Sequence, residues 1–539
     1  MDVVATPTPT QPQPLAGFGH IFRFMARRDR LRAPIWVVSI VGLFATSVAS
    51  VVGLYSTPAE LQEYADIAGV DAALKAIAGP GYGLDNPTQG AVVMNETLLY
   101  TFIGIALMCM FSIIRHTRAE EETDRAELVR AASVGRLATL TAACLWVALI
   151  DGVVALGIVM SLLAFGLPVE GTVAFGLAAW GIGLVFIGVA ATTAQVASSA
   201  RAATAGAGGV LGVSFILRAV GDLGTGWMTW LSPLGWAQSI RAFADERWWV
   251  LAPIGFAAVV LVGTGVALSS KRDLGAGLLR QRPGPEEASP GLATPLAMAA
   301  RQQRTSLISW TLGIAFIGFF FGIVADEADQ LLENETIAEF YSQAGTGTPT
   351  EAFLATTVLM VALIASGFTV STVLRLRAEE SAGRAAAVMA TPVSRYRWAS
   401  SYLIVSVVGT VVVMAVSGLA IGVGYGLQLG DTDQLLPVLG AALAIVPALL
   451  VLAAFAVALI GLRPSLASLA WLGVVVSATV GLLAETLDLP QWSRNLSPFE
   501  HVPALPAASL EVFPLVMLLL VAAGITAVGL VAMRRRDVG

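Results

Sequence analysis

The chain has 539 residues, of which 56% are hydrophobic and only 13% are charged. Soluble domains carry about 25% charged residues, so the polar residues are too few to cover a water-facing surface, which argues against a soluble helical bundle. The formal net charge of −6 comes from acidic stretches between apolar runs, such as 326–339, and does not indicate a nucleic-acid partner.

The N-terminal region is predicted to contain a tail and a helix on the membrane surface. Residues 1–15 are rich in Pro and Thr, which favours a disordered tail. The apolar run at 33–54 is too long for a signal-peptide core and is expected to remain as a membrane helix. The apolar stripe beside the arginines of 14–32 suits an interfacial helix, and 293–305 precedes the second half in the same way. A plain basic flank is the alternative interpretation.

Long apolar runs predict a multi-pass all-α membrane protein. About 20 residues of helix cross the roughly 30 Å of hydrocarbon, and only helices satisfy every backbone group within one segment there. We expect twelve spans, at 34–55, 96–114, 137–164, 171–197, 204–222, 249–270, 306–325, 351–374, 399–426, 435–461, 465–483 and 512–533.

The distribution of basic residues predicts the orientation. With the N-terminus inside, 26 of the 31 Lys and Arg residues fall on the inner side of the twelve spans. The positive-inside rule therefore places both termini in the cytoplasm. The abundance of Arg over Lys hints at a bacterial source, which makes the bacterial cytoplasmic membrane the expected location.

The chain contains the same plan twice. The letters RAEE at 118–121 recur at 377–380, an offset of 259, and LSP at 231–233 recurs at 496–498. Because six spans is an even number, the two copies run parallel and predict a pseudo-two-fold axis along the membrane normal. The expected parts are a tail at 1–15, a first six-helix half at 16–272, a cytoplasmic linker at 273–292 and a second half at 293–539.

The repeated charged loops are the strongest functional signal. Glu121 precedes Arg125 by four residues, and Glu380 precedes Arg384 by four, a spacing that brings the side chains together on a helix. Each loop is therefore predicted to form a short amphipathic helix on the inner membrane surface that docks a partner protein. A solvated positive-inside loop remains the alternative.

Several segments together resemble a known family. These are the two RAEE loops, ATPVSR at 390–395, LRAVGD at 217–222, and LSPLGW at 231–236 with its partner LSPFEH at 496–501. Over nearly the whole chain after about residue 15, the sequence resembles permeases of type-2 ABC exporters, especially the fused bacterial form tied to export of polyketides and other antibiotics. Thr123-Asp124 stands where the family usually has Gly, so the two docking loops are expected to be unequal.

The resemblance implies a permease with cytoplasmic elbow and coupling helices that works with two copies of a separate ABC ATPase, which binds ATP and Mg. This chain contains no Gly-Lys-Ser/Thr phosphate-binding loop, because its only lysines are Lys75 and Lys271. We expect no catalytic residues, no cofactor and no metal in this chain. The expected coupling residues are Arg118, Glu120, Glu121, Arg125, Arg136, Arg377, Glu379, Glu380, Arg384 and Arg395.

An amphipathic small molecule is the expected substrate. By resemblance, spans two and five of each half line its path, and flexible or aromatic side chains suit varied apolar ligands. Ordinary packing is the alternative for each of the path candidates, which are Phe102, Met108, Phe111, Phe215 and Phe368.

Three charged residues are expected within the membrane. Asp151 in span three is either a proton or cation site or a buried structural carboxylate. Arg218 and Asp222, four residues apart, predict a structural ion pair. The Trp-rich segment 223–248 suits an interfacial belt, and the family suggests a re-entrant gate there. Two other functions remain open, a proton-coupled secondary transporter acting through Asp151 and a non-transporting immunity or sensing subunit.

Overall fold

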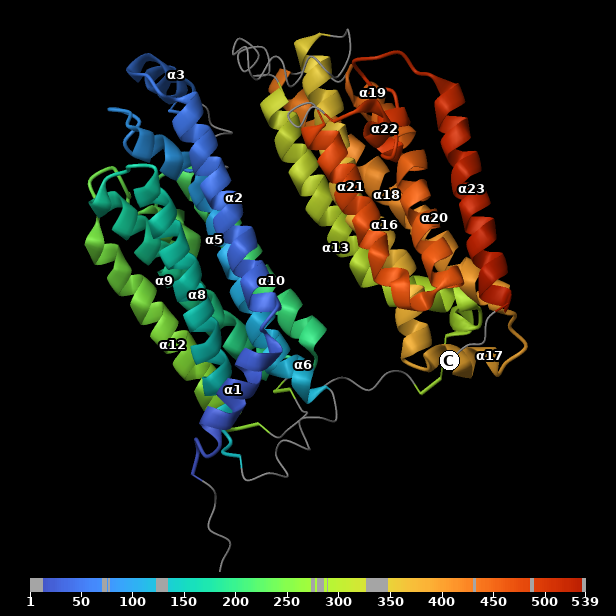
Figure 1. Ribbon diagram of the computed structural model, residues 1–539, viewed down its shortest axis with the longest axis horizontal. Helices are drawn as coiled ribbons and strands as arrows, with labels where there is room; N and C mark the ends of the chain where they lie inside the picture. Colours follow the sequence, from blue (N-terminus) through green and yellow to red (C-terminus); the bar gives the residue numbers. More distant parts are fainter. Residues whose placement is uncertain are drawn as a thin grey trace, which may run out of the picture. The chain divides into compact units, whose positions relative to one another are not determined.

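The computed structural model separates into two compact units, Met1–Gly284 and Pro285–Gly539. It describes residues 13–69, 75, 78–122, 134–272, 277–278, 286–287, 289–325, 348–429, 433–484 and 489–535. Within these residues the regular structure is helical throughout (Figure 1).

Twelve helical stretches of the described chain are long and apolar enough to cross a membrane, which confirms the predicted number of spans. Their bounds are Arg32–Leu54, Gln89–Glu121, Ala138–Ala164, Val169–Val196, Ala200–Leu223, Trp248–Ser269, Pro295–Ile323, Thr350–Ser381, Arg395–Leu427, Leu435–Leu462, Pro464–Gly481 and Val512–Arg535. The chain is an integral membrane protein.

The first unit is built around α5 and α9, of which 67% and 72% of the most apolar stretch is buried. Small residues allow the close packing of α9 against α12, since a Cβ atom added at Gly188 would lie 2.6 Å from Leu261 Cβ. The elements are α1 (Phe18–Arg28), α2 (Arg32–Leu54), α3 (Pro58–Ala68), α5 (Gln89–His116), α6 (Arg118–Glu121), α8 (Ala138–Ala164), α9 (Val169–Val196), α10 (Ala200–Leu223), η1 (Met228–Leu231), α11 (Pro233–Gln238), η2 (Trp248–Val250) and α12 (Leu251–Ser269).

The second unit is built around α16 and the pair α19 and α20. The tenth span of the chain, which belongs to this unit, is interrupted at Ile445. Pro447, at the start of α20, lacks a backbone donor and so cannot continue the hydrogen bonding of α19. The elements are η3 (Pro290–Leu292), α13 (Pro295–Val324), α16 (Pro349–Ser381), α17 (Arg384–Met389), α18 (Arg395–Leu429), α19 (Leu435–Ala444), α20 (Val446–Leu462), η5 (Pro464–Leu469), α21 (Ala470–Leu483), α22 (Gln491–Arg494), η6 (Pro498–His501) and α23 (Val512–Arg535).

The two units use corresponding helix pairs. In the first, α9 packs on α5 and α12, and α2 packs on α8; in the second, α20 packs on α16 and α23, and α13 packs on α18. The helices α20 and α23 pack closely because Gly461 faces Gly529. A Cβ atom added at Gly461 would lie 2.1 Å from the backbone oxygen of Gly529. The sequence repeat is therefore also a repeat of helix packing.

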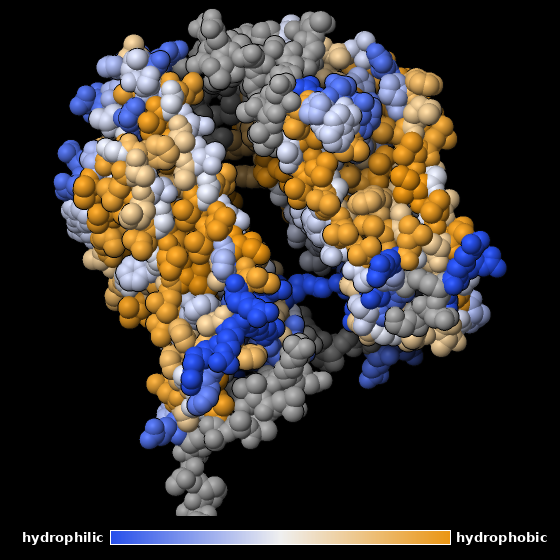
Figure 2. All heavy atoms as spheres, in the orientation of Figure 1, coloured by the Kyte–Doolittle hydropathy of each residue, from blue (hydrophilic) through white to orange (hydrophobic). Residues whose placement is uncertain are grey.

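The outward surfaces of the helices are apolar. On the face shown in Figure 2, hydrophobic side chains cover the middle of each unit, and hydrophilic residues gather towards its ends. Large exposed side chains include Phe256 and Val259 of α12, which are 72% and 73% exposed, and Leu520 of α23. Such a continuous apolar exterior suits contact with lipid.

The two predicted elbow helices differ. In the first unit, α1 is a separate helix that buries Ile21 and Met25 and is followed by a break before α2. In the second unit, 293–305 forms no separate helix, because α13 begins at Pro295 and continues unbroken into the membrane span. The prediction of a second elbow is wrong, and the physical reason is that no helix-breaking turn separates Pro295 from the apolar part of α13.

Candidate functional site

The first charged segment is a single helical turn, α6, that is tied to distant parts of its own unit. The backbone turns at Thr117, between the end of α5 and α6. Glu120 pairs with Arg28 of α1, and Glu121 accepts from Arg118 at 2.9 Å and also pairs with Arg272, just after α12. The segment therefore joins the elbow helix and the end of the last span to the end of α5.

Two buried arginines hold this junction. Arg118, 1% exposed, donates through Nη2 to the Ser198 carbonyl oxygen at 2.6 Å, and Arg272, 8% exposed, donates through Nε to Gln195 Oε1 at 2.6 Å. Arg136 donates to the backbone oxygen of Arg272 at 2.6 Å. Arg118 and Arg136 were expected as coupling residues, and both lie in this network; Arg125 lies outside the described residues.

A carboxylate that sequence reasoning missed lies beside the junction. Asp29, between α1 and α2, is 3% exposed and contacts Arg115, lies 2.5 Å from His116 Nε2, and accepts from Trp146 Nε1 at 3.1 Å. Burial raises the pKa of Asp29, but the hydrogen bonds and the His116 charge outweigh burial and hold the pKa well below its usual range. The one sequence signal was an acid interrupting the basic run at 23–32.

The second charged segment contains several ion pairs between residues close in sequence. Glu379 accepts from Arg384 Nε at 2.6 Å and Nη2 at 2.9 Å, while Glu380 pairs with Arg377 at 3.2 Å. The predicted pairing of Glu380 with Arg384 is therefore wrong. The helix does not run through this region, because α16 ends at Ser381 and Gly383 has a φ of 71°.

The helix α17 presents an outward surface beyond this turn. The Arg384 side chain is 58% exposed although it is paired with Glu379, and these bonds raise the pKa of Arg384. Ala385 is buried against the unit, whereas Ala386 and Ala387 are exposed, and Arg395 begins α18 half-buried. The two repeated segments share one ion pair, which joins Arg118 to Glu121 in the first copy and Arg377 to Glu380 in the second, but their other ion pairs differ.

Asp151 lies in the interior of α8, fully buried. Among the described residues neither of its carboxylate oxygens has a hydrogen-bond partner. Gly183 of α9 makes room for it, since a Cβ there would lie 2.1 Å from Asp151 Oδ2. A buried acid without partners is expensive unless it is neutral, so this carboxyl is suited to holding a proton.

Arg218 and Asp222 of α10 form the ion pair expected from their spacing, at 3.4 Å. Asp222 also accepts from Gln238 Nε2 at 2.8 Å and from Thr229 Oγ1 at 2.9 Å. These bonds tie η1 and α11 to α10, so the Trp-rich segment 223–248 folds back into the unit as short helical pieces. Trp230 stacks on Trp249 at 5.3 Å.

The five path candidates fall in different environments. Phe102 and Met108 are fully buried in α5, and Phe368 is 1% exposed in α16. Phe111 is 42% exposed, and Phe215 is half-buried beneath the Arg218 guanidinium, 5.2 Å from its ring centre. Phe111 is therefore the candidate most open to a ligand or to lipid.

Comparison with known proteins agrees with this architecture. A family model described as the C-terminal domain of multidrug efflux system permease Rv1217c matches residues 292–534, which lie in the second unit. The multidrug efflux system permease protein Rv1217c of Mycobacterium tuberculosis is 39% identical over 525 residues, which cover 96% of this chain and 94% of that protein. The chain belongs to this family of multidrug efflux permeases. Because the similarity extends over both units, the assignment applies to the permease as a whole.

Proposed function

We propose that this permease is the membrane subunit of an ATP-driven pump that exports amphipathic drugs or polyketide-like antibiotics. Its relative is named a multidrug efflux system permease, and an efflux pump needs an energy source. Since this sequence has no Gly-Lys-Ser/Thr loop, the proposed source is a separate ABC ATPase, two copies of which bind ATP and Mg. The permease then lies in the bacterial plasma membrane, with both termini and the charged segments on the cytoplasmic side.

The exposed helix α17 is the observation that carries this proposal. It lies at the end of α16, the span with the largest buried share, 78%, and the Arg384 to Glu379 bonds attach it to that helix. A partner that pushes on α17 would therefore act directly on the core of the second unit. In the first unit, Glu120 and Glu121 provide the corresponding attachment to α1 and to the end of α12.

Transport would follow from alternating access, in which ATP-driven closure of the partner subunits moves the two units between inward-open and outward-open arrangements. Substrate would enter from the inner leaflet. A binding partner can shift such an equilibrium only if its affinity for the two arrangements differs. The ATPase must therefore bind the charged segments differently with and without ATP.

One observation favours a second candidate, a proton-coupled transporter. Asp151 is buried and has no hydrogen-bond partner among the described residues, as a proton carrier in a membrane would be. The two candidates differ in their energy source. Vanadate blocks an ABC ATPase, whereas a protonophore blocks proton coupling.

The deciding experiment measures efflux from inverted vesicles that contain the permease and its partner ATPase. We expect ATP-dependent, vanadate-sensitive uptake of a fluorescent drug, lowered at least tenfold by Arg384→Glu, because that change reverses the charge beside Glu379 and on the α17 surface. Asp151→Asn should leave it within twofold. The matched control Glu511→Gln changes an exposed charge before α23. Vanadate-insensitive uptake abolished by Asp151→Asn would instead establish the proton-coupled function.

A further inference from the structure

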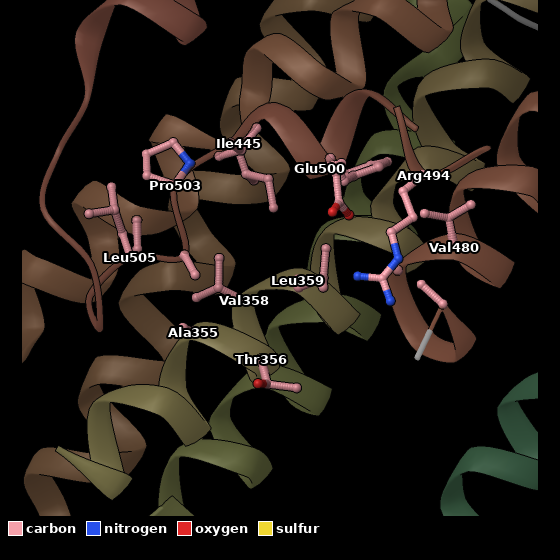
Figure 3. Close-up of a pocket in the computed structure, with 16 residues that line it drawn as sticks. Ala355, Thr356, Val358, Leu359, Ile445, Val480, Arg494, Glu500, Pro503 and Leu505 are labelled. Atoms are coloured by element: carbon pink, nitrogen blue, oxygen red, sulfur yellow. The ribbon is translucent and has the colours of Figure 1, made fainter. Parts of the chain in front are cut away.

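A cavity of about 280 Å³ lies within the second unit, at the end where α16 begins. Its walls come from α16, α21, the junction of α19 with α20, and the segment 494–505 (Figure 3). The apolar part includes Val358, Leu359, Ile445 and Leu505. The volume is near the lower end of ligand pockets, roughly 300 Å³, so a small amphipathic molecule fits.

The first unit has a much smaller cavity beside Gln238, the residue that aligns with Pro503. The match of LSP at 231–233 with 496–498 sets Gln238 opposite Pro503 in the two copies. The cavity beside Gln238 measures only about 10 Å³, and residues 78–82, with Met94 and Leu98 of α5, line it. The two cavities therefore differ in volume and in the segments that line them.

Three aligned positions differ between the two copies near these cavities. At the same offset of 265, Phe215 becomes Val480 and Gln238, which is bonded to Asp222, becomes Pro503. Gly235 becomes Glu500. In the first unit no side chain fits at that position, because an added Cβ would lie 2.1 Å from the Thr229 backbone oxygen. At these aligned positions the second unit has two smaller side chains, Val480 and Pro503, and one added carboxylate, Glu500.

The charge on the wall defines the ligand. In Figure 3 the charged ends of Glu500 and Arg494 both turn towards the cavity, above Leu359. Arg494 is already bound within the chain, through its Nε donor to the Leu489 carbonyl oxygen at 3.2 Å and through further interactions. Among the described residues the Glu500 side chain makes no ion pair, so its carboxylate is open to a cationic ligand.

We propose that this cavity binds an amphipathic organic cation, with the apolar body against α16 and the cationic group beside Glu500. The inference names a substrate class and a resting place for the proposed efflux function, on which it rests. In the orientation proposed above, the cavity faces the outer side, so a substrate would occupy it late in export. The exposed carboxylate of Glu500 at the edge of an apolar cavity of about 280 Å³ favours cations over neutral molecules of the same size.

The test measures equilibrium binding of ethidium, a fluorescent organic cation, to the full-length permease in lipid nanodiscs without ATP or partner. Glu500→Gln should weaken ethidium binding about tenfold, the effect of losing roughly 1.4 kcal/mol, and leave binding of neutral Nile red within twofold. Val480→Phe, which restores the residue of the first unit, should weaken both probes. Glu511→Gln is the control and should change neither. Unchanged ethidium binding in Glu500→Gln and Val480→Phe would overturn the proposal.

A second measurement does not depend on how those variants fold. Ala504→Cys places a thiol on the cavity wall, while both native cysteines are buried. Ethidium should slow its reaction with a maleimide at least fivefold and leave exposed Ser509→Cys unaffected. Equal rates with and without ethidium would refute the site. Neither binding assay uses ATP, so the two proposals can fail separately. Ethidium binding in this cavity combined with vanadate-insensitive efflux would reject the proposed energy source but not the binding site.

Discussion

Replacing Asp29 by Ala should destabilise the first unit more than any exposed acid does. The change leaves Arg115 and His116 without their shared carboxylate in a site where Asp29 is 3% exposed. Removing one partner of a buried ion pair costs about 3–5 kcal/mol. At about 2–4 °C per kcal/mol for a unit of this size, the expected fall in Tm is roughly 6–20 °C.

The sign of the pH dependence follows from the lowered pKa of Asp29. A carboxyl whose folded-state pKa is depressed contributes stability above its unfolded pKa of about 3.9 and loses it as the pH falls towards the folded value. The Tm difference between wild type and Asp29→Ala should therefore persist from pH 8 to pH 5 and shrink only in stronger acid.

Thermal unfolding of the purified permease in detergent, followed by tryptophan fluorescence, checks this prediction. Trp146, which donates to Asp29, is one of twelve tryptophans that contribute to this signal. The control is Asp66→Ala, an exposed acid bonded to Gln62 at 2.7 Å, which should change stability by less than about 0.5 kcal/mol. Equal Tm values for Asp29→Ala and Asp66→Ala would refute the stabilising role of the Asp29 cluster.

Other changes test separate parts of the structure by the same melting assay. Gly183→Ala should lower the Tm because its Cβ would lie 2.1 Å from Asp151 Oδ2, and adding Asp151→Ala should recover much of the loss; no recovery would contradict the contact. Arg272→Ala should destabilise the first unit by about 1–3 kcal/mol, because Gln195 loses a buried donor while Glu121 keeps its pair with Arg118, and a neutral effect would show that the junction is dispensable. Asp222→Asn should cost less than Asp222→Ala, because an amide can still accept from Thr229.

The sequence predicted the spans well because their lengths are set by the bilayer and their composition by lipid. All twelve predicted spans have a counterpart, and the apolar run at 435–461, for example, corresponds to Leu435–Leu462. The ion pair between Arg218 and Asp222 was also predictable, since residues four apart in one helix lie on the same face.

Contacts between distant residues could not be predicted. Glu120 pairs with Arg28 and Glu121 with Arg272 across separations of 92 and 151 residues, which no local spacing encodes. Local reasoning also failed at Glu380, because the left-handed Gly383 interrupts the helix that the i, i+4 rule assumes. The cavity beside Glu500 was missed because its walls come from segments that lie far apart in the sequence.

The central claim is that a separate ATPase drives export through the charged segments, and reconstitution tests it most directly. Purified permease should be placed in proteoliposomes with and without its partner ATPase, with ATP on the side of α17 and no ion gradient. We predict drug transport only when both proteins and ATP are present, and none when vanadate is added. Transport by the permease alone, driven by a proton gradient, would contradict the account.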